Sequence, residues 1–207
     1  MKSYLMENYG YDEPIFLNEL FVEGMSDNAV RQAVKRLVAY GFLERYDNGI
    51  YYIPKQGGLL GKSYLDPYLV IIRKYVQSKS ETYGYISGIS FANQLGLTTQ
   101  MPAMIEVVTN REATNGRMVK LGNFAVRIKK APVTVSDSNA ELLQFLDGVS
   151  QIEKYTEYPM EETINRLLAY AKKMQFKRDQ LSEVSTALTG ATAKKMIDWG
   201  MIYEFTS

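Results

Sequence analysis

The chain has 207 residues, of which 46% are hydrophobic and 23% charged, and its formal net charge is +1. This composition is typical of a globular protein, and the length allows two small domains. Cysteine and histidine are absent, which excludes disulfides, Cys/His zinc sites and Ser-His-Asp or Cys-His catalysis. The sequence has neither an 18-residue apolar run nor a secretory leader, so we expect a cytoplasmic protein with no membrane partner.

The first 55 residues predict a helix over residues 2–9, an extended piece at 14–16 and a short helix at 17–22. After a turn at residues 23–25, Ser26 is a good N-cap for an amphipathic helix, Asp27–Tyr40, which Gly41 ends. Residues 42–46 and 50–53 flank an Asn48-Gly49 turn, the strongest short-range signal for a β-hairpin. Pro54 ends its second strand.

This order of elements predicts a winged helix-turn-helix DNA-binding domain over residues 1–55. The helix Asp27–Tyr40 turns Val30, Ala33, Val34 and Leu37 to one side, and its opposite face is polar. Such a face can enter the major groove, where Arg, Asn and Gln read bases and Lys attracts phosphate, while the hairpin touches the backbone or minor groove. The predicted DNA contacts are Asn28, Arg31, Gln32, Lys35, Arg36, Arg45, Tyr46, Asn48, Tyr51 and Lys55.

Residues 55–63 carry three glycines and predict a linker to a second domain over residues 64–207. There we expect helices at 66–77, 87–96, 136–146, 160–176 and 179–199, and strands at 104–109, 117–121 and 124–129. The predicted fold class is α+β: an N-terminal winged helix-turn-helix followed by a mixed α+β domain with C-terminal helices.

Charge is unevenly distributed along the chain. Residues 1–55 hold 6 Lys and Arg against 8 Asp and Glu, residues 56–130 hold 10 against 4, and residues 131–207 hold 8 against 11. The basic middle third indicates either an accessory phosphate-binding surface or an ordinary solvated sheet face. Its residues are Arg111, Arg117, Lys120, Arg127, Lys129 and Lys130.

Two stretches, VRQAVKRLVAYGFLERYDNGIYYIPK and GYISGISFANQLGLTTQMP, together resemble the AbiEi-like antitoxins. The family's G-x-x-S-x-x-x-x-x-x-x-L-x-L-T type segment is matched by Gly84, Ser87, Leu95, Leu97 and Thr98. The strands AMIEVVTNRE and RMVKLGNFAVRIKKAP also look like the family's core. The resemblance covers about residues 5–150 and is weak over the last fifty.

This resemblance implies the antitoxin half of a toxin–antitoxin or phage-defence module. Its winged helix would bind inverted repeats in the module's own promoter, and its second domain would counter a nucleotidyltransferase-like toxin, without a stable complex in the best-studied group. A palindromic site would suggest two copies of the chain. The resemblance brings no catalytic residues, cofactor or metal. The alternative function is a protein-interaction adaptor whose winged helix binds a partner chain.

A third hypothesis, a carboxylate-based enzyme, has little support. Serines at 87–90 have no evident base beside them. Glu161-Glu162 and Asp137 with Glu141 could chelate magnesium, but such acids are also favoured at helix N-termini by the helix dipole. We therefore expect no enzymatic activity.

Overall fold

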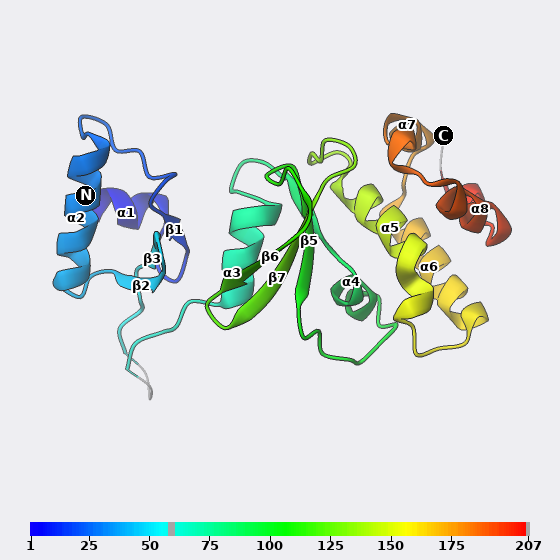
Figure 1. Ribbon diagram of the computed structural model, residues 1–207, viewed down its shortest axis with the longest axis horizontal. Coiled ribbons are helices and arrows are strands. Elements are labelled where there is room, and N and C mark those ends of the chain that lie inside the picture. The colour runs from blue at the N-terminus through cyan, green and yellow to red at the C-terminus, as the bar shows by residue number, and fades with distance from the viewer. Residues whose placement is uncertain (58–60, 206–207) are drawn as a thin grey trace. The chain divides into compact units, whose positions relative to one another are not determined.

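The computed structural model describes residues 1–57 and 61–205 (Figure 1). The chain forms two compact units. The first comprises Met1–Lys74 with Leu121–Asn123, and the second comprises Tyr75–Lys120 with Phe124–Ser207. Each unit combines helices with an antiparallel or mixed sheet, which confirms the predicted α+β class.

The first unit begins with helix α1 (Lys2–Asn8) and strand β1 (Ile15–Phe16), followed by helix α2 (Asp27–Ala39) and the hairpin β2 (Glu44–Asp47) and β3 (Ile50–Tyr52). The three strands form an antiparallel sheet in the order β1-β3-β2. Gly49 takes a φ of +72° in the turn between β2 and β3, which explains why glycine stands at this position.

The short helix predicted at residues 17–22 is wrong. The structure has turns and extended backbone there, and Leu17 donates its N–H to the carbonyl of Gly49 (2.9 Å), which ties this segment to the hairpin. Leu20 is buried but its neighbour Phe21 is 75% exposed.

Helix α2 follows the predicted pattern closely. The Ser26 hydroxyl accepts a hydrogen bond from the Ala29 N–H (3.3 Å), which caps the first turn. On the inner face, Val30, Val34 and Leu37 are buried. They pack in one core with Leu5 of α1, Ile15 of β1, Leu20 of the segment before α2, and Leu43 and Ile53, which flank the hairpin strands.

The two units divide after Lys74, beyond the linker expected at 55–63, of which residues 58–60 lie outside the described part of the chain. The last residue of that linker and the residues up to Lys74 belong to the first unit: Ser63 accepts from the Lys55 N–H (2.8 Å), and Arg73 pairs with Glu13 (3.2 Å). The helix expected at 66–77 is α3 (Pro67–Ile71), which Asp66 caps. The helix continues as a π-helical turn, Ile72–Val76.

The second unit contains a four-stranded sheet in the order β4-β5-β7-β6. Its strands are β4 (Gly84–Ser87), β5 (Ile105–Thr109), β6 (Asn115–Leu121) and β7 (Phe124–Lys130). Strand β5 pairs antiparallel with β4 and parallel with β7. Strand β4 is an element that the sequence analysis did not anticipate.

Five helices accompany this sheet: α4 (Ile89–Gln94), α5 (Ala140–Gln151), α6 (Met160–Met174), α7 (Arg178–Glu183) and α8 (Gly190–Asp198). In Figure 1, α5 and α6 lie side by side on one side of the sheet. The core here joins Tyr85 and Val108 of the sheet to Phe145 of α5 and Leu167 of α6. No helix in the described ranges is long and apolar enough to cross a membrane.

The single helix predicted at 179–199 is wrong, because α7 and α8 are separate. Between them lie a 3-10 turn (Ser185–Ala187) and Leu188 in extended backbone. Thr189 then starts a new helix, its hydroxyl accepting from the Thr192 N–H (3.1 Å). This N-cap and the burial of Val184 in the core fix the break.

Candidate nucleic-acid interface

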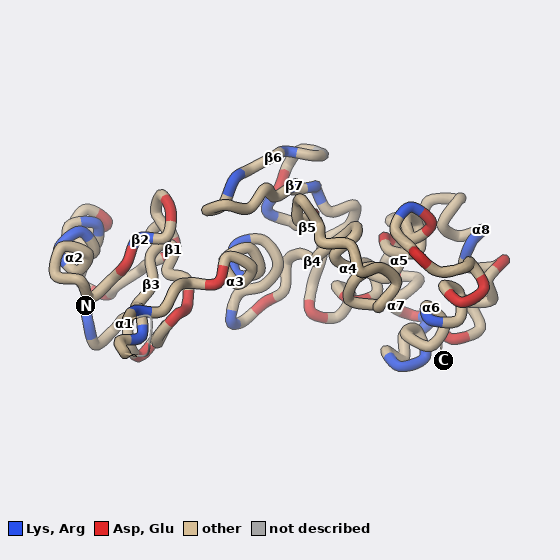
Figure 2. Tube along the Cα trace, turned by 90° about the horizontal axis from the view of Figure 1, so that it is seen from below, with Lys and Arg blue, Asp and Glu red and all other residues tan. Residues whose placement is uncertain are grey.

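The outward face of α2 is polar along its whole length. The side chains of the five residues predicted to enter the groove are all exposed: Asn28, Arg31, Gln32, Lys35 and Arg36. This helix is locally basic, because it carries three cations, Arg31, Lys35 and Arg36, against one acid, Asp27, in its first turn. The tube in Figure 2 shows these cations as blue segments on α2. The structure thus brings this predicted set together on one face.

The hairpin residues behave less uniformly. The guanidinium of Arg45 donates to the Asn48 side-chain oxygen (3.2 Å) and to the Asp47 carbonyl (3.3 Å), which holds it against the turn. Both Arg45 and Asn48 are exposed. Lys55 is also exposed, with its ammonium 3.7 Å from a carboxylate oxygen of Asp12. These three can still reach a ligand.

The two predicted tyrosine contacts lie deeper. The Tyr46 hydroxyl is buried and has no hydrogen-bond partner within the described residues, and burial raises the pKa of this phenol. It packs so closely on Gly122 that a Cβ there would lie 2.6 Å from the hydroxyl. Tyr51 is half-buried and packs against the core of the first unit. Packing is therefore the role that the structure gives both rings.

The predicted basic surface of the second unit is largely neutralised. Arg127 and Lys129 both pair with Glu106 on β5, Arg127 at 3.7 Å, because these side chains leave neighbouring strands on the same face. Arg117 donates to Glu112 (2.8 Å). The exposed remainder of the predicted set is Arg111, whose guanidinium stacks on Tyr83 (3.7 Å), together with Lys120 and Lys130.

Glu112 is the best-held carboxylate in this region. It accepts from the Ala113 and Thr114 N–H groups (3.0 and 3.1 Å) and the Thr114 hydroxyl (2.9 Å) as well as from Arg117. The Arg117 bond, followed by the Thr114 N–H, lowers the pKa of Glu112 to about 2. This residue was not predicted, because its backbone donors lie in an irregular turn and its cationic partner, Arg117, lies on β6.

The segment that carried the family resemblance has structural contacts throughout. Gly84 and Leu97 are buried, Leu95 packs against the core, and Thr98 donates to Glu157 (2.9 Å). Ser87 donates to the carboxylate of Asp147 on α5, an acceptor that spacing alone could not indicate because 60 residues separate them. At 1% exposure, Ser87 is inaccessible to a substrate.

The acidic pairs weighed for magnesium lie apart from one another. Glu162 pairs with Arg166 (2.7 Å) one turn further along α6, and Glu161 lies beside it in the first turn of that helix. Glu141 occupies the first turn of α5, and Asp137 is exposed just before it. Across the described ranges, no three acidic side chains come together in an arrangement that could hold a metal ion.

Residues 11–178 fit the model of a family of unknown function, DUF6088. No curated protein matches the chain.

Proposed function

Since the chain belongs to the DUF6088 family of unknown function, we propose from the geometry of its first unit that it binds duplex DNA and regulates transcription of its own gene. The observation that carries this proposal is the outward face of α2. That face presents Arg31, Gln32 and Lys35 with Asn28 and Arg36 to solvent, while the opposite face is sealed in the core.

The dimensions and chemistry of α2 suit the major groove. Its 13 residues span about 20 Å, and a helix of this diameter fits the groove. Arginine can bond guanine bidentately and glutamine or asparagine can bond adenine, whereas lysine contributes mainly phosphate attraction. The order α1, β1, α2, β2, β3 supports the proposal in part: it offers α2 as a recognition helix and β2–β3 as a wing, whereas turns stand where a winged helix has its middle helix.

We further propose that the protein is the antitoxin of a two-gene module that counters a nucleotidyltransferase-like toxin, and that it acts without enzymatic activity or a cofactor. This part rests on the resemblance of residues 5–150 to AbiEi-like antitoxins. Co-expression with the neighbouring toxin tests it: the chain should restore growth. An Arg31→Ala/Lys35→Ala variant should restore growth equally well but release the promoter from repression.

A protein-interaction adaptor is the second candidate, and exposed aromatic residues favour it. Phe21 and Tyr40, which flank α2 in the sequence, are 75% and 78% exposed, and exposed aromatic side chains are enriched at protein interfaces. A partner that co-purifies stoichiometrically and is lost in a Phe21→Ser/Tyr40→Ser variant, in a protein that does not bind DNA, would favour this function.

DNA binding is tested by fluorescence anisotropy on the duplex upstream of the gene and on random duplex, across a salt series. The Arg31→Ala/Lys35→Ala variant should bind at least about 30-fold more weakly, because base and phosphate contacts are each worth about 1–3 kcal/mol. Lys172→Ala/Lys173→Ala, which removes two exposed cations from α6, is the charge-matched control and should bind normally. Equal affinity for both duplexes at every salt concentration would refute the proposal.

A further inference from the structure

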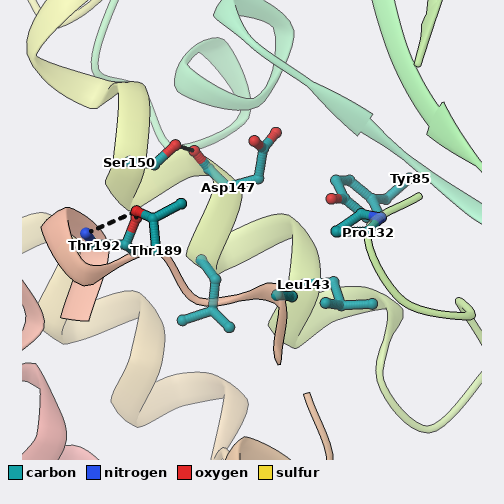
Figure 3. Close-up of a pocket in the computed structure, with 9 residues that line it drawn as sticks. Tyr85, Pro132, Leu143, Asp147, Ser150, Thr189 and Thr192 are labelled. Atoms are coloured by element: carbon teal, nitrogen blue, oxygen red, sulfur yellow. Dashed lines mark hydrogen bonds between the residues drawn. The ribbon is translucent and has the colours of Figure 1, made fainter. Parts of the chain in front are cut away.

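A cavity of about 100 Å³ in the second unit lies between α5 and the segment that leads into α8. Its apolar wall consists of Pro132, Leu143, Leu146 and Ala187, and its polar groups come from Tyr85, Asp147, Ser150, Thr189 and Thr192. It is partly open to solvent. Figure 3 shows the Asp147 carboxylate and the Tyr85 ring extending toward the same space.

Tyr85 is the unusual member of this lining. Its side chain is 5% exposed, yet its hydroxyl makes no hydrogen bond to any part of the chain that the structure describes. Among the described residues only the Tyr46 hydroxyl is both fully buried and unpartnered, so the Tyr85 hydroxyl keeps access to the partly open cavity, where a ligand can accept from it. Burial, and then the charge of Asp147, raise the pKa of this hydroxyl, so it is a neutral donor without an acceptor.

Asp147 presents the complementary group. Its carboxylate accepts from the Ser87 hydroxyl and from the Gln151 side-chain amide (2.9 Å), both neutral donors. Within the described ranges it has no cationic partner: Lys195 donates to the Ser150 carbonyl (3.2 Å) but pairs with Glu153 (2.9 Å). A carboxylate has about four acceptor positions, so Asp147 can take a further donor from inside the cavity.

The group that satisfies both side chains must accept from Tyr85 and donate to Asp147. A hydroxyl does both, an ammonium can only donate, and a carboxylate or phosphate can only accept and would be repelled by Asp147. The hydroxyls of Thr189 and Thr192 hydrogen-bond each other (2.9 Å) and retain further acceptor capacity. The aliphatic wall suits the C–H faces of a carbon chain.

The volume limits the size of the occupant. A cavity of about 100 Å³ is several times the roughly 10–15 Å³ that one water molecule needs, so it admits one compact small molecule. We propose that this cavity is a binding site for a small polyol, or for the diol edge of a sugar, held between the Tyr85 hydroxyl and the Asp147 carboxylate. This site does not depend on DNA binding.

Titration of the full-length ¹⁵N-labelled protein with glycerol tests the proposal. Amide resonances of Ser150, Thr189 and Thr192 should shift and saturate at millimolar glycerol. The Tyr85→Phe variant, which breaks no hydrogen bond within the described chain, should bind about 3- to 10-fold more weakly, since a net hydrogen bond contributes about 0.5–1.5 kcal/mol. Tyr203→Phe, at a 78% exposed tyrosine, should bind like the wild type.

A second measurement uses the wild-type protein alone. Nuclear Overhauser effects from glycerol protons to the Leu143 and Ala187 methyl groups should be observed if the ligand fills the cavity. Three results would overturn the proposal: shifts that grow linearly without these contacts, equal affinity of the wild type and Tyr85→Phe, or tighter binding of propylammonium than of glycerol. Linear shifts without these contacts would mean that the cavity holds only water. Tighter binding of propylammonium would mean that it is a cation site.

Discussion

Gly84, the first residue of β4, has no space for a side chain. A Cβ built on it would lie 2.2 Å from the Tyr75 carbonyl oxygen and 2.6 Å from the Val108 carbonyl oxygen. Both obstacles are backbone atoms, so no rotamer change can relieve them. The φ of Gly84 lies outside the left-handed region, so the backbone conformation itself would accept alanine. Only the lack of space excludes it.

The size of the effect of Gly84→Ala follows from this geometry. Alanine at an unstrained glycine position stabilises a protein by about 0.4–1 kcal/mol by restricting the unfolded chain. Forcing a methyl group into a filled site costs about 1–3 kcal/mol, and more where only the backbone can move. Because two backbone carbonyls, one in the π-helical turn and one in β5, must shift by about 1 Å, we expect a net loss of about 3 kcal/mol, or a melting temperature lower by about 6–12 °C.

Trp199 is the only tryptophan in the chain and lies in the second unit, so its fluorescence follows the unfolding of that unit in urea or heat. Gly190→Ala is the matched control: nothing lies within 4 Å of a Cβ at Gly190, the first residue of α8. It should be neutral or stabilise by up to about 1 kcal/mol. If Gly84→Ala melts within about 1 °C of the wild type, the packing argument fails.

Three further substitutions test other contacts. Gly148→Ala would place a Cβ 2.4 Å from the buried ring of Phe91, and should destabilise by about 1–3 kcal/mol in the same fluorescence assay despite its better helix propensity. Glu112→Gln should lower the melting temperature at pH 6, and the deficit should shrink toward pH 3. The pKa of Glu112 falls from 4.5 unfolded to about 2 folded, so its stabilisation is complete above pH 4.5 and is lost progressively as the pH falls from 4.5 to about 2; a constant deficit would contradict this. Tyr46→Phe removes a buried hydroxyl without a partner in the described structure, so calorimetry should find stability unchanged or higher by up to about 1 kcal/mol, and a clear loss would reveal a hidden partner.

Elements whose ends carry their own chemical signals could be predicted from the sequence. Helix α2 has the Ser26 cap, three buried positions at helical spacing and Gly41 after its end, and the hairpin has Asn48-Gly49. The five exposed side chains of α2 followed from the same periodicity. These features depend on neighbours within about four residues along the chain, which is why sequence alone reveals them.

Features that depend on distant residues could not be predicted. Strand β4 is buried on both faces, so it lacks the alternation that marks a half-exposed strand, and its flanking glycines resemble a loop. The basic middle segment could be counted, but its neutralisation requires Glu106 to lie beside Arg127 and Lys129, which only the parallel pairing of β5 with β7 achieves. Ser87 meets Asp147 only because α5 packs on β4.

The strand order of the second unit has a consequence for its synthesis. Strand β7 lies between β5 and β6, so the parallel partner of β5 is the last of the four strands to leave the ribosome. At about 5–20 residues per second, translation from Thr109 to Lys130 takes about 1–4 s. During that interval β5, with its apolar Val107 and Val108, has β4 on one edge and an open edge on the other. An open apolar edge templates pairing with other chains, so the nascent protein is most vulnerable to aggregation in these seconds. The β6–β7 hairpin closes in microseconds. It then covers the open edge of β5 as a preformed unit and ends the exposure.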